Sequence, residues 1–451
     1  MSHSRFAFTA LVALVLTGAG CRRSAPVQVA APVALEPAGA VALTWIDQHA
    51  SPITISDSGR ATIDPAALHA FVANARIVGI SELTEGTREF PALIRALIWG
   101  LAERDTLRAL AIQAPAAEAM ELDRYVRGGS GTARAMLRLL GSSHWETREM
   151  IELVDWLRAF NRTRPVPAQV GFYGFEIPNI AHAARVVTSL SDTSVSPSLK
   201  QWLTQQYGCV VEGERANWGR EGYAADSTYW RRCAAVAFAA ADSLGALRQR
   251  VAATRPGSDI AFAEQMARLV AHSADVGLRR LPRHEAVAEH VLWIANTFAT
   301  NGTLLVWGRD VEAGRLTLPN GGPTQMAVAL TQKVSGRYRA LAFAVGQGTI
   351  RAQRLAMGRE PGGETALPVG LPLADSYENV LNRSRHDAFL LDLRQPPSGE
   401  AGTWLTGPHS IRLISGQYAP EVQESFVTAV KFPEYYDGIL FVKRAVAASK
   451  P

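Results

Sequence analysis

The 451-residue sequence predicts an α/β fold in which helices flank a mostly parallel central sheet, with a largely helical insertion or cap lobe. Short apolar runs alternate with longer stretches of helical periodicity, which is typical of a sheet buried on both faces. Residues 181–300 have helical periodicity and no convincing strand. With 47% hydrophobic and 19% charged residues, the chain has enough apolar material for a large core. Extended disorder and fibrous repeats are therefore excluded.

Individual elements follow from the spacing of apolar residues. In the first half we expect strands at residues 76–81, 107–113 and 170–175, and helices at 94–104, 116–126 and 149–161. Strands resume at residues 303–307, 339–345, 388–393, 411–415 and 438–442. The Gly/Pro-rich residues 357–372 are expected to form a long loop at the edge of the site. Trp99, Trp156 and Trp293 are expected to pack between helices.

These patterns divide the chain into segments. We expect a signal peptide at 1–20, a lipidated N-terminus and Ala/Pro tether at 21–42, the first part of the α/β core at 43–180, the helical lobe at 181–300, and the second part of the core at 301–451.

The first residues are typical of an export signal. Arg5 precedes an apolar run at residues 6–16, and small residues then lead to Cys21, a pattern too short to span a bilayer stably. The residues before Cys21 resemble a bacterial lipobox, so we expect Cys21 to be acylated; cleavage beside an unmodified cysteine is the alternative. Position 22 is Arg rather than Asp, which favours anchoring in the outer membrane, facing the periplasm.

Charge and cysteine content narrow the expected partners. Lys and Arg (46) exceed Asp and Glu (41) by 5, without a basic block or an aromatic–basic motif, so no nucleic acid is expected. An exported protein meets an oxidising compartment, where Cys209 and Cys233 are expected to form a structural disulfide. The remaining partners are a small-molecule substrate or ligand and, through the N-terminal lipid, a membrane.

Polar and charged residues follow the predicted strands. They are Glu82, Glu85, Arg88 and Glu89 after the first strand, Gln113 at the end of the second, Glu176 after the third, and Arg309 and Asp310 after the fourth. Ligands bind outside the carboxyl ends of parallel strands, so we expect these residues to share a cavity, with Glu82 facing Arg309. For any single residue, a position on the solvated rim of the sheet is the alternative.

Several segments resemble the erythromycin esterase family and, more distantly, the ChaN-like group. They are IVGISELTEGTREF, LAIQAPAAEAMELDRYVRGG, WETREMIELVDWLRAFN, VGFYGFE, RHEAVAEHVLW, TLLVWGRDVE, DAFLLDLR and EYYDGILFVKRA. They occur in the family's order and cover about residues 76–446. The resemblance implies an α/β sheet with a helical lobe, and hydrolysis of ester or lactone bonds in a small molecule.

The resemblance also implies site residues, and the first motif departs from the family pattern. In G-E-x-x-H-G-x-x-E, this sequence keeps Glu82, Gly86 and Glu89, but Ser81 replaces the first glycine. Glu85 stands at the position of the histidine that activates the attacking water.

Two further motifs depart in the same way. Gln113 replaces the glutamate that ends the family's second strand, and it cannot accept a proton. In the family's W-A-H-N-x-H motif, Arg309 and Glu312 replace both histidines. The family's histidine-based mechanism therefore cannot be transferred to this chain.

A buried carboxylate is the remaining candidate for a general base. Glutamate titrates near 4.3 and histidine near 6.5, but burial beside Glu82 and Glu89 is expected to raise the pKa of Glu85. The catalytic candidates are therefore Glu82, Glu85, Glu89 and Gln113. The candidates for substrate binding are Arg88, His144, Glu176, Arg309, Asp310 and Glu312. Arg309 suits an anionic group or an oxyanion.

Each of these assignments has an alternative. For Glu85 and Arg309, the alternative is a structural ion pair in a site that has lost its activity. For His144, the alternative is an ordinary histidine of the core or the rim. No cofactor is expected, although Glu82 and Glu85 carry the oxygen ligands that a divalent cation prefers.

Two hypotheses about function follow. The first is an exported, lipid-anchored, erythromycin esterase-like hydrolase whose carboxylate-rich site is weakly active or inactive. The second is a lipoprotein of the same fold that binds a small molecule without catalysis.

Overall fold

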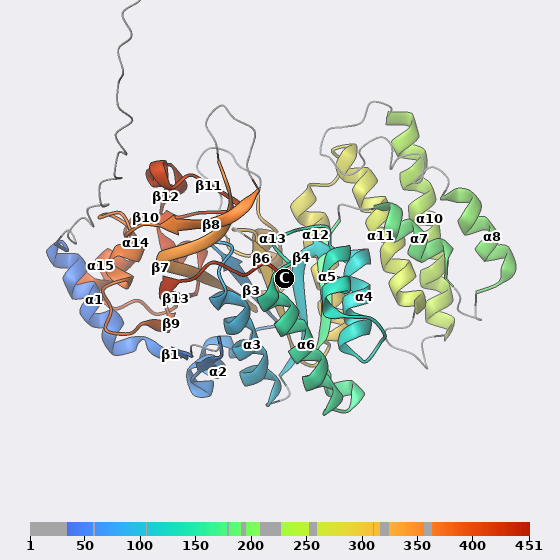
Figure 1. Ribbon diagram of the computed structural model, residues 1–451. Helices are drawn as coiled ribbons and strands as arrows, with labels where there is room; N and C mark the ends of the chain where they lie inside the picture. Colours follow the sequence, from blue (N-terminus) through green and yellow to red (C-terminus); the bar gives the residue numbers. More distant parts are fainter. Residues whose placement is uncertain are drawn as a thin grey trace, which may run out of the picture. The chain divides into compact units, whose positions relative to one another are not determined.

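The computed structural model describes residues 34–56, 59–104, 106–177, 180–190, 195–207, 227–251, 259–309, 311–315, 324–355 and 363–451. Apart from residue 34, they belong to one compact unit, Leu35–Pro451 (Figure 1). Cys21, Cys209 and Asp310 lie outside the described residues, as does the expected signal peptide. Within the described ranges, no helix has both the length and the apolarity needed to cross a bilayer.

The core is a mixed sheet whose central strands are parallel. Its order is β2-β1-β9-β13-β7-β3-β6-β4-β5; the strands from β13 to β5 pair in parallel, and β9, β1 and β2 add antiparallel pairs at one edge. The strands are β1 (Ser51–Ile55), β2 (Ala61–Ile63), β3 (Ile77–Glu82), β4 (Leu107–Pro115), β5 (Gly171–Glu176), β6 (Thr303–Arg309), β7 (Tyr338–Arg354), β8 (Glu364–Val369), β9 (Ala388–Asp392), β10 (His409–Arg412), β11 (Gln417–Tyr418), β12 (Val427–Val430) and β13 (Gly438–Ala445). The predicted fold class is confirmed.

Helices cover both faces of this sheet. They are α1 (Pro37–His49), α2 (Pro65–Val72), α3 (Glu89–Ala102), α4 (Ala116–Val126), α5 (Ala133–Leu139), α6 (Arg148–Arg162), α7 (Ile180–Thr188), α8 (Pro197–Gln206), α10 (Ser227–Val251), α11 (Asp259–Gly277), α12 (Arg283–Phe298), α13 (Met326–Lys333), α14 (Tyr377–Leu381), α15 (Gly399–Thr406) and α16 (Phe432–Tyr435). Short 3₁₀ turns occur at Val166–Ala168 and Pro420–Phe426.

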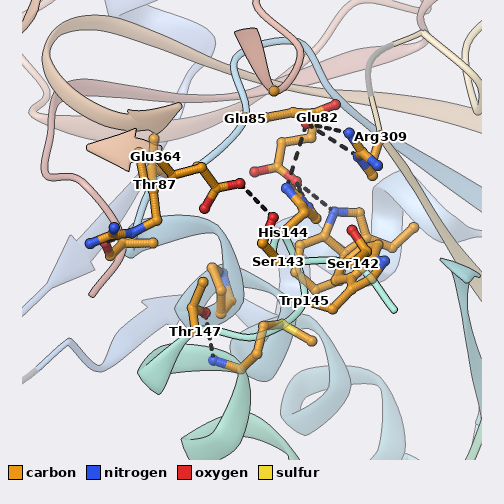
Figure 2. A pocket seen from close by; sticks show the side chains of 17 residues that line it. Glu82, Glu85, Thr87, Ser142, Ser143, His144, Trp145, Thr147, Arg309 and Glu364 are labelled. Atoms are coloured by element: carbon orange, nitrogen blue, oxygen red, sulfur yellow. Dashed lines mark hydrogen bonds and ion pairs between the residues drawn. The ribbon is translucent and has the colours of Figure 1, made fainter. Parts of the chain in front are cut away.

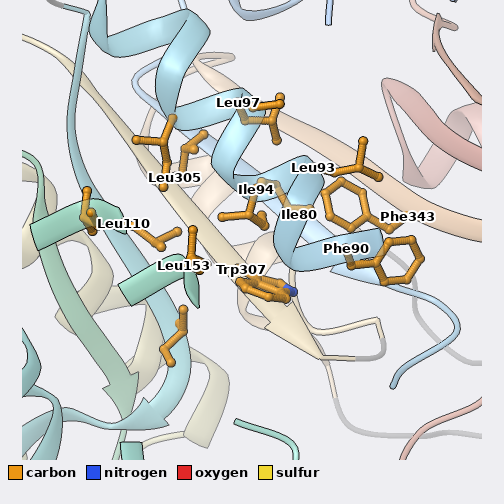
Figure 3. Close-up of a cluster of buried hydrophobic side chains, with 14 of the residues drawn as sticks. Ile80, Phe90, Leu93, Ile94, Leu97, Leu110, Leu153, Leu305, Trp307 and Phe343 are labelled. Carbon is orange, nitrogen blue, oxygen red and sulfur yellow. The ribbon is translucent and has the colours of Figure 1, made fainter. Parts of the chain in front are cut away.

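The alternation of side chains along β3 builds a core on each face. Val78 and Ile80 face the layer of α2 to α6, while Ile77 faces the layer of α1 and α12 to α16. Leu93 and Leu97, one helical turn apart on α3, belong to the same buried cluster as Ile80 in the first layer (Figure 3). Because β3 is buried on both faces over its whole length, its position in the sheet is strongly specified.

The helical lobe is a third packed cluster. Apolar residues of α7, α8, α10 and α11 pack together and against the start of α4. The following helix, α12, packs instead on the sheet, so the lobe ends at α11 although helical periodicity continues to residue 298. Cys233 is buried in α10 and disulfide-bonded, while its expected partner Cys209 lies outside the described residues.

Two expectations about local structure are wrong, and two others need a smaller adjustment. Residues 37–42, expected in the tether, begin α1, which packs on α15. The stretch 357–372, expected as a loop, contains β8, which pairs with the second half of β7. A strand is present near the expected 411–415, but it is β10 at His409–Arg412 and pairs with β12 in a separate two-stranded sheet. Trp99 of α3 packs on Phe160 of α6 with ring centroids 5.8 Å apart, as expected, but it remains 51% exposed.

Candidate functional site

A cavity opens beyond the carboxyl ends of β3 and β6, in the middle of the parallel strands (Figure 2). Its empty volume is about 560 Å³, part of which is open to solvent. Its lining comes from the segment after β3, the loop before α6, the end of β6, β7, β8 and residues 416 and 448. Segments far apart in the sequence therefore meet here, as expected at the strand ends of such a sheet.

Glu82 and Arg309 are brought together by strand register. Glu82 is the last residue of β3 and Arg309 the last of β6, and the two are direct partners across the parallel pair. Glu85 follows in the loop, where its backbone N–H donates to Ile414 O over 2.9 Å. The guanidinium of Arg309 approaches Glu85 Oε2 through both Nε and Nη2 at 3.2 Å. The expectation that the acidic tip of β3 faces Arg309 is confirmed.

Gly86 shapes the loop that carries Glu85. Its φ of +83° lies in the left-handed region, and a Cβ there would stand 2.1 Å from Arg351 O. Its carbonyl accepts hydrogen bonds from the backbone N–H groups of Arg351 and Ala448. Only glycine allows this close approach, so the loop conformation depends on Gly86.

His144 enters the cavity from the loop before α6. The neighbouring Trp145 is buried, packs edge-on against Trp307 at 5.0 Å, and donates from Nε1 to Gln113 O over 3.2 Å. At the other end of the loop, Thr147 caps α6 by accepting from Met150 N. Because Trp145 and the cap hold the loop, the imidazole of His144 is directed into the cavity (Figure 2).

The imidazole of His144 lies between two carboxylates. Its Nε2 is 3.4 Å from Glu82 Oε2, and its Nδ1 is 3.5 Å from Glu85 Oε2. Glu82 Oε2 also accepts from Trp307 Nε1 over 3.2 Å. Glu82 and Glu85 are nearly inaccessible to solvent, and the cations of Arg309 and protonated His144 compensate their charges.

The surroundings favour the protonated form of His144. Burial, the largest single contribution, lowers its pKa, and Arg309 acts in the same direction. The charges of Glu82 and Glu85 and the contact with Glu82 outweigh both, so the pKa of His144 is raised above its usual value. Neutral imidazole is therefore a stronger base here than in water.

Gln113 lies behind the cavity and connects Arg309 at the end of β6 to Glu176 at the end of β5. Its Oε1 accepts from Arg309 N over 2.7 Å, and its Nε2 donates to Glu176 Oε1 over 3.0 Å. Arg283, at the start of α12, contacts Glu176 Oε2 and lies 3.9 Å from Glu312 Oε1. Gln113, Glu176 and Glu312, predicted as site residues, therefore hold the wall and do not line the cavity.

Glu89 and Arg88 also lie outside the cavity. Glu89 is buried at the start of α3, where it accepts from Val446 N over 3.1 Å and from Arg88 Nε over 3.1 Å. Burial raises the pKa of Glu89, against the opposing effect of these hydrogen bonds. Arg88 lines a separate surface cleft with α6. The sequence motif places both residues near the site, but the first turn of α3 directs them away from it.

Several lining residues were not predicted, among them Ser143, Arg351 and Glu364. Ser143 donates to Glu364 Oε1 over 2.5 Å, which joins the loop before α6 to β8 across the cavity (Figure 2). Arg351, on β7, lines the same side and donates from Nε to Ala448 O. The sequence signal for Glu364 was absent, because residues 357–372 were interpreted as a loop.

The donor set does not suit a metal ion. Among the residues that the structure describes, no group of three or more His, Cys, Asp or Glu side chains is arranged to hold one. Oε2 of Glu85, one of the two suggested ligands, is already in contact with Arg309 and His144. His290 is buried and does not line the cavity; its Nε2 donates to Gly174 O over 3.1 Å, and its Nδ1 accepts from Gln265 Nε2 over 2.9 Å.

Comparison with known families agrees with this architecture. A family profile described as erythromycin esterase matches residues 102–445, which is more than half of the chain. The chain belongs to the erythromycin esterase family. This membership supports assignment to a class of hydrolases.

Solved structures share the erythromycin esterase-like fold. A Bacillus cereus protein has a TM-score of 0.74 at 18% identity, covering 92% of this chain and 99% of that protein. A succinoglycan biosynthesis protein has a TM-score of 0.74 at 17% identity, covering 93% and 100%. A mutant of the erythromycin esterase EreC in its open conformation has a TM-score of 0.58 at 16% identity, covering 88% and 98%. At these identities the likeness concerns the fold alone.

Proposed function

We propose that this member of the erythromycin esterase family hydrolyses ester or lactone bonds of a small molecule, with His144 as the general base. The observation that carries the proposal is the imidazole of His144 held between Glu82 and Glu85 inside the cavity. A base oriented by a carboxylate is the arrangement that activates water or a hydroxyl in many hydrolases. The family's own histidine position is Glu85, so the base reaches the site from a different segment.

The step requires one nitrogen of His144 that is oriented and one that contacts water, so Nδ1 must exchange its 3.5 Å contact with Glu85 Oε2 for a contact with water. Glu82, fixed by Trp307 Nε1, orients the Nε2 side of His144 and stabilises the imidazolium. Nδ1 then accepts a proton from water as the water oxygen attacks the carbonyl carbon. The imidazolium returns this proton to the leaving alkoxide when the C–O bond breaks, giving an acid and an alcohol. Glu85 is a weaker candidate for the base, because Arg309 contacts its Oε2 through two nitrogens.

Arg309 supplies the compensating positive charge. Its side chain is 32% exposed, so its guanidinium reaches both Glu85 and the space inside the cavity. The oxygen of a tetrahedral intermediate gains negative charge beside it, and a guanidinium stabilises such an oxyanion. Gln113 fixes the backbone of Arg309 and so positions this group.

The test is hydrolysis of a panel of aryl and alkyl esters and lactones by the purified protein. In His144→Gln, kcat/KM is expected to fall by about 10² to 10⁴, the range for loss of a general base. In the active protein, kcat/KM is expected to rise with pH through an apparent pKa above 6.5. His69→Gln is the matched control, because His69 is a half-buried histidine on α2 that contacts Gly100 O and not the cavity. Equal activity of the two variants contradicts the proposed base.

Binding without turnover is the second candidate. It is favoured by the closed set of contacts among Glu85, Arg309 and His144, which compensates every charge before a substrate enters. If the whole panel stays unhydrolysed while a small molecule raises the Tm and is recovered intact, this candidate replaces the first.

We also propose that the protein is exported and anchored to the outer membrane through acylated Cys21. Support comes from the apolar run at residues 6–16 and the small residues that precede Cys21. Metabolic labelling with a fatty acid is expected to mark the wild-type protein and not Cys21→Ser. Membrane fractionation checks the location, and equal labelling of both proteins contradicts the proposal.

A further inference from the structure

The outer face of α3 borders two clefts that share Arg95. One lies between α3 and α6 and is lined by Arg88, Arg95 and Arg148. The other lies between α3 and β2 and is lined by Arg60, Arg95 and Trp99. Their empty volumes are about 730 and 870 Å³, including space open to solvent. Arg95 therefore stands between the two clefts, which together we call the groove, and it does not line the cavity that holds His144.

Positive charge gathers at this junction. Arg60 is exposed, and the side chain of Arg148 is 62% exposed. Burial, and then the nearby charge of Arg60, lowers the pKa of Arg95, while Glu152 acts in the opposite direction. Arg95 forms no ion pair with a carboxylate of the described residues. Two guanidinium groups that repel each other, one of them partly buried, are stabilised by an anion between them.

The acidic residues of the groove form ion pairs with Arg148, and none with Arg95 or Arg60 is found among the described residues. Glu149 accepts from Ser449 N over 3.0 Å and so is held by the backbone. Glu152 is 64% exposed and lies 3.8 Å from Arg148 Nε, a geometry in which a surface ion pair is weak. At Arg148 an incoming anion competes with Glu152 and with Glu149, whose Oε1 lies 3.9 Å from Arg148 Nη2.

The second cleft adds an apolar surface beside the charge. Trp99 is 51% exposed, one of the few large apolar side chains on the described surface. The guanidinium of Arg95 lies 4.9 Å from the ring centroid of Trp156, which lines the same cleft. An exposed tryptophan next to a cation held over an aromatic ring offers both a stacking surface and a charge.

We infer that this groove binds a single amphiphilic anion, with its phosphate or carboxylate at Arg95 and Arg60 and its apolar chain over Trp99 and Trp156. The positive charges of Arg95 and Arg60 determine where the anionic headgroup binds, and the exposed indole of Trp99 determines where the apolar chain lies. The concave shape favours one bound molecule over contact with a flat bilayer. The site is separate from ester hydrolysis, so it does not depend on the proposed catalytic role of His144.

The experiment measures binding of octyl phosphate, below its micellar concentration, by titration calorimetry and by the shift in Tm. Octyl phosphate is expected to bind with one site per chain. Inorganic phosphate lacks the chain and octyl glucoside lacks the charge, so both are expected to bind at least about tenfold more weakly, a difference of about 1.4 kcal/mol. Octyl glucoside that binds as tightly as octyl phosphate overturns the anionic part of the inference.

Variants locate the site. Arg95→Gln and Trp99→Ala are each expected to raise the Kd of octyl phosphate at least about tenfold. Arg134→Gln is the matched control, because Arg134 is an exposed arginine on α5 outside the groove and its loss changes the net charge equally. An unchanged Kd in both groove variants overturns the inference. Binding to phosphatidylglycerol vesicles that octyl phosphate does not compete also overturns it, in favour of contact with a membrane surface.

Discussion

The imidazole between Glu82 and Glu85 makes a specific prediction about stability. His144→Gln keeps an uncharged polar side chain of similar reach but removes the charge that faces two buried carboxylates. Since the folded protein raises the pKa of His144, its ion-pair contribution is fully present below the unfolded value of about 6.5. It is lost as the pH rises through the raised folded pKa. The substitution is therefore expected to destabilise the protein more at pH 6 than at pH 9.

The distances set the size of the effect. At 3.4 and 3.5 Å and an effective dielectric constant of about 20, each contact of protonated His144 amounts to about 5 kcal/mol before desolvation. Desolvation and repulsion from Arg309 reduce the sum, and breaking a buried pair typically costs about 3–5 kcal/mol. We expect a loss of about 3 kcal/mol in the free energy of unfolding at pH 6. At pH 9 it should approach the roughly 1 kcal/mol of a neutral hydrogen bond.

The assay is urea unfolding of the wild-type protein and His144→Gln at several pH values between 6 and 9. His69→Gln serves as the control, because it removes a half-buried histidine that contacts Gly100 O and no carboxylate of the cavity. A difference that is constant over this range, or larger at pH 9, refutes the reasoning about the charge of His144.

Three further predictions use the same measurement of unfolding. Gln113→Glu, which restores the family's residue, places a second carboxylate where the amide now donates to Glu176 over 3.0 Å. We expect the free energy of unfolding to fall by about 2 kcal/mol at pH 8 and by less towards pH 5, where the new carboxylate is protonated. A loss that does not depend on pH contradicts this prediction. Gly86→Ala should cost about 3 kcal/mol or more because its Cβ meets a carbonyl oxygen at 2.1 Å, whereas Gly59→Ala, with φ of +72° and open space, should cost only about 1 kcal/mol. Burial lowers the pKa of His290 to about 4, so at pH 5 this histidine is neutral in the folded protein and protonated in the unfolded chain. Lowering the pH from 8 to 5 should therefore reduce the free energy of unfolding of the wild-type protein by about 2 kcal/mol more than that of His290→Gln.

The buried strands were predictable because their signal is local. The expected strand at 76–81 corresponds to Ile77–Glu82, and the expected helix at 116–126 is Ala116–Val126. The second half of β7 was missed, because Gly346 and Gly348 interrupt its apolar pattern and its partners β8 and β11 come from later in the chain. Pairing between strands that are distant in the sequence cannot be predicted from the spacing of apolar residues within each segment.

The site was predictable at the strand ends and less so elsewhere. Register alone brings Glu82 beside Arg309, since both end neighbouring parallel strands. His144 was a candidate with an open alternative, because the burial of Trp145 against Trp307 decides where its loop points. For Glu89, sequence proximity to Glu85 was misleading, because the first turn of α3 rotates its carboxylate towards Val446.

The wall formed by residues 446–449 has a consequence for biosynthesis. Ala448 lines the cavity, and its neighbours donate to Glu89, Thr349 and Glu149. The contact between Glu89 and Val446 spans 357 positions. A ribosome must therefore translate past residue 449 before the pocket can form completely, and a nascent chain halted earlier lacks this part of the pocket wall.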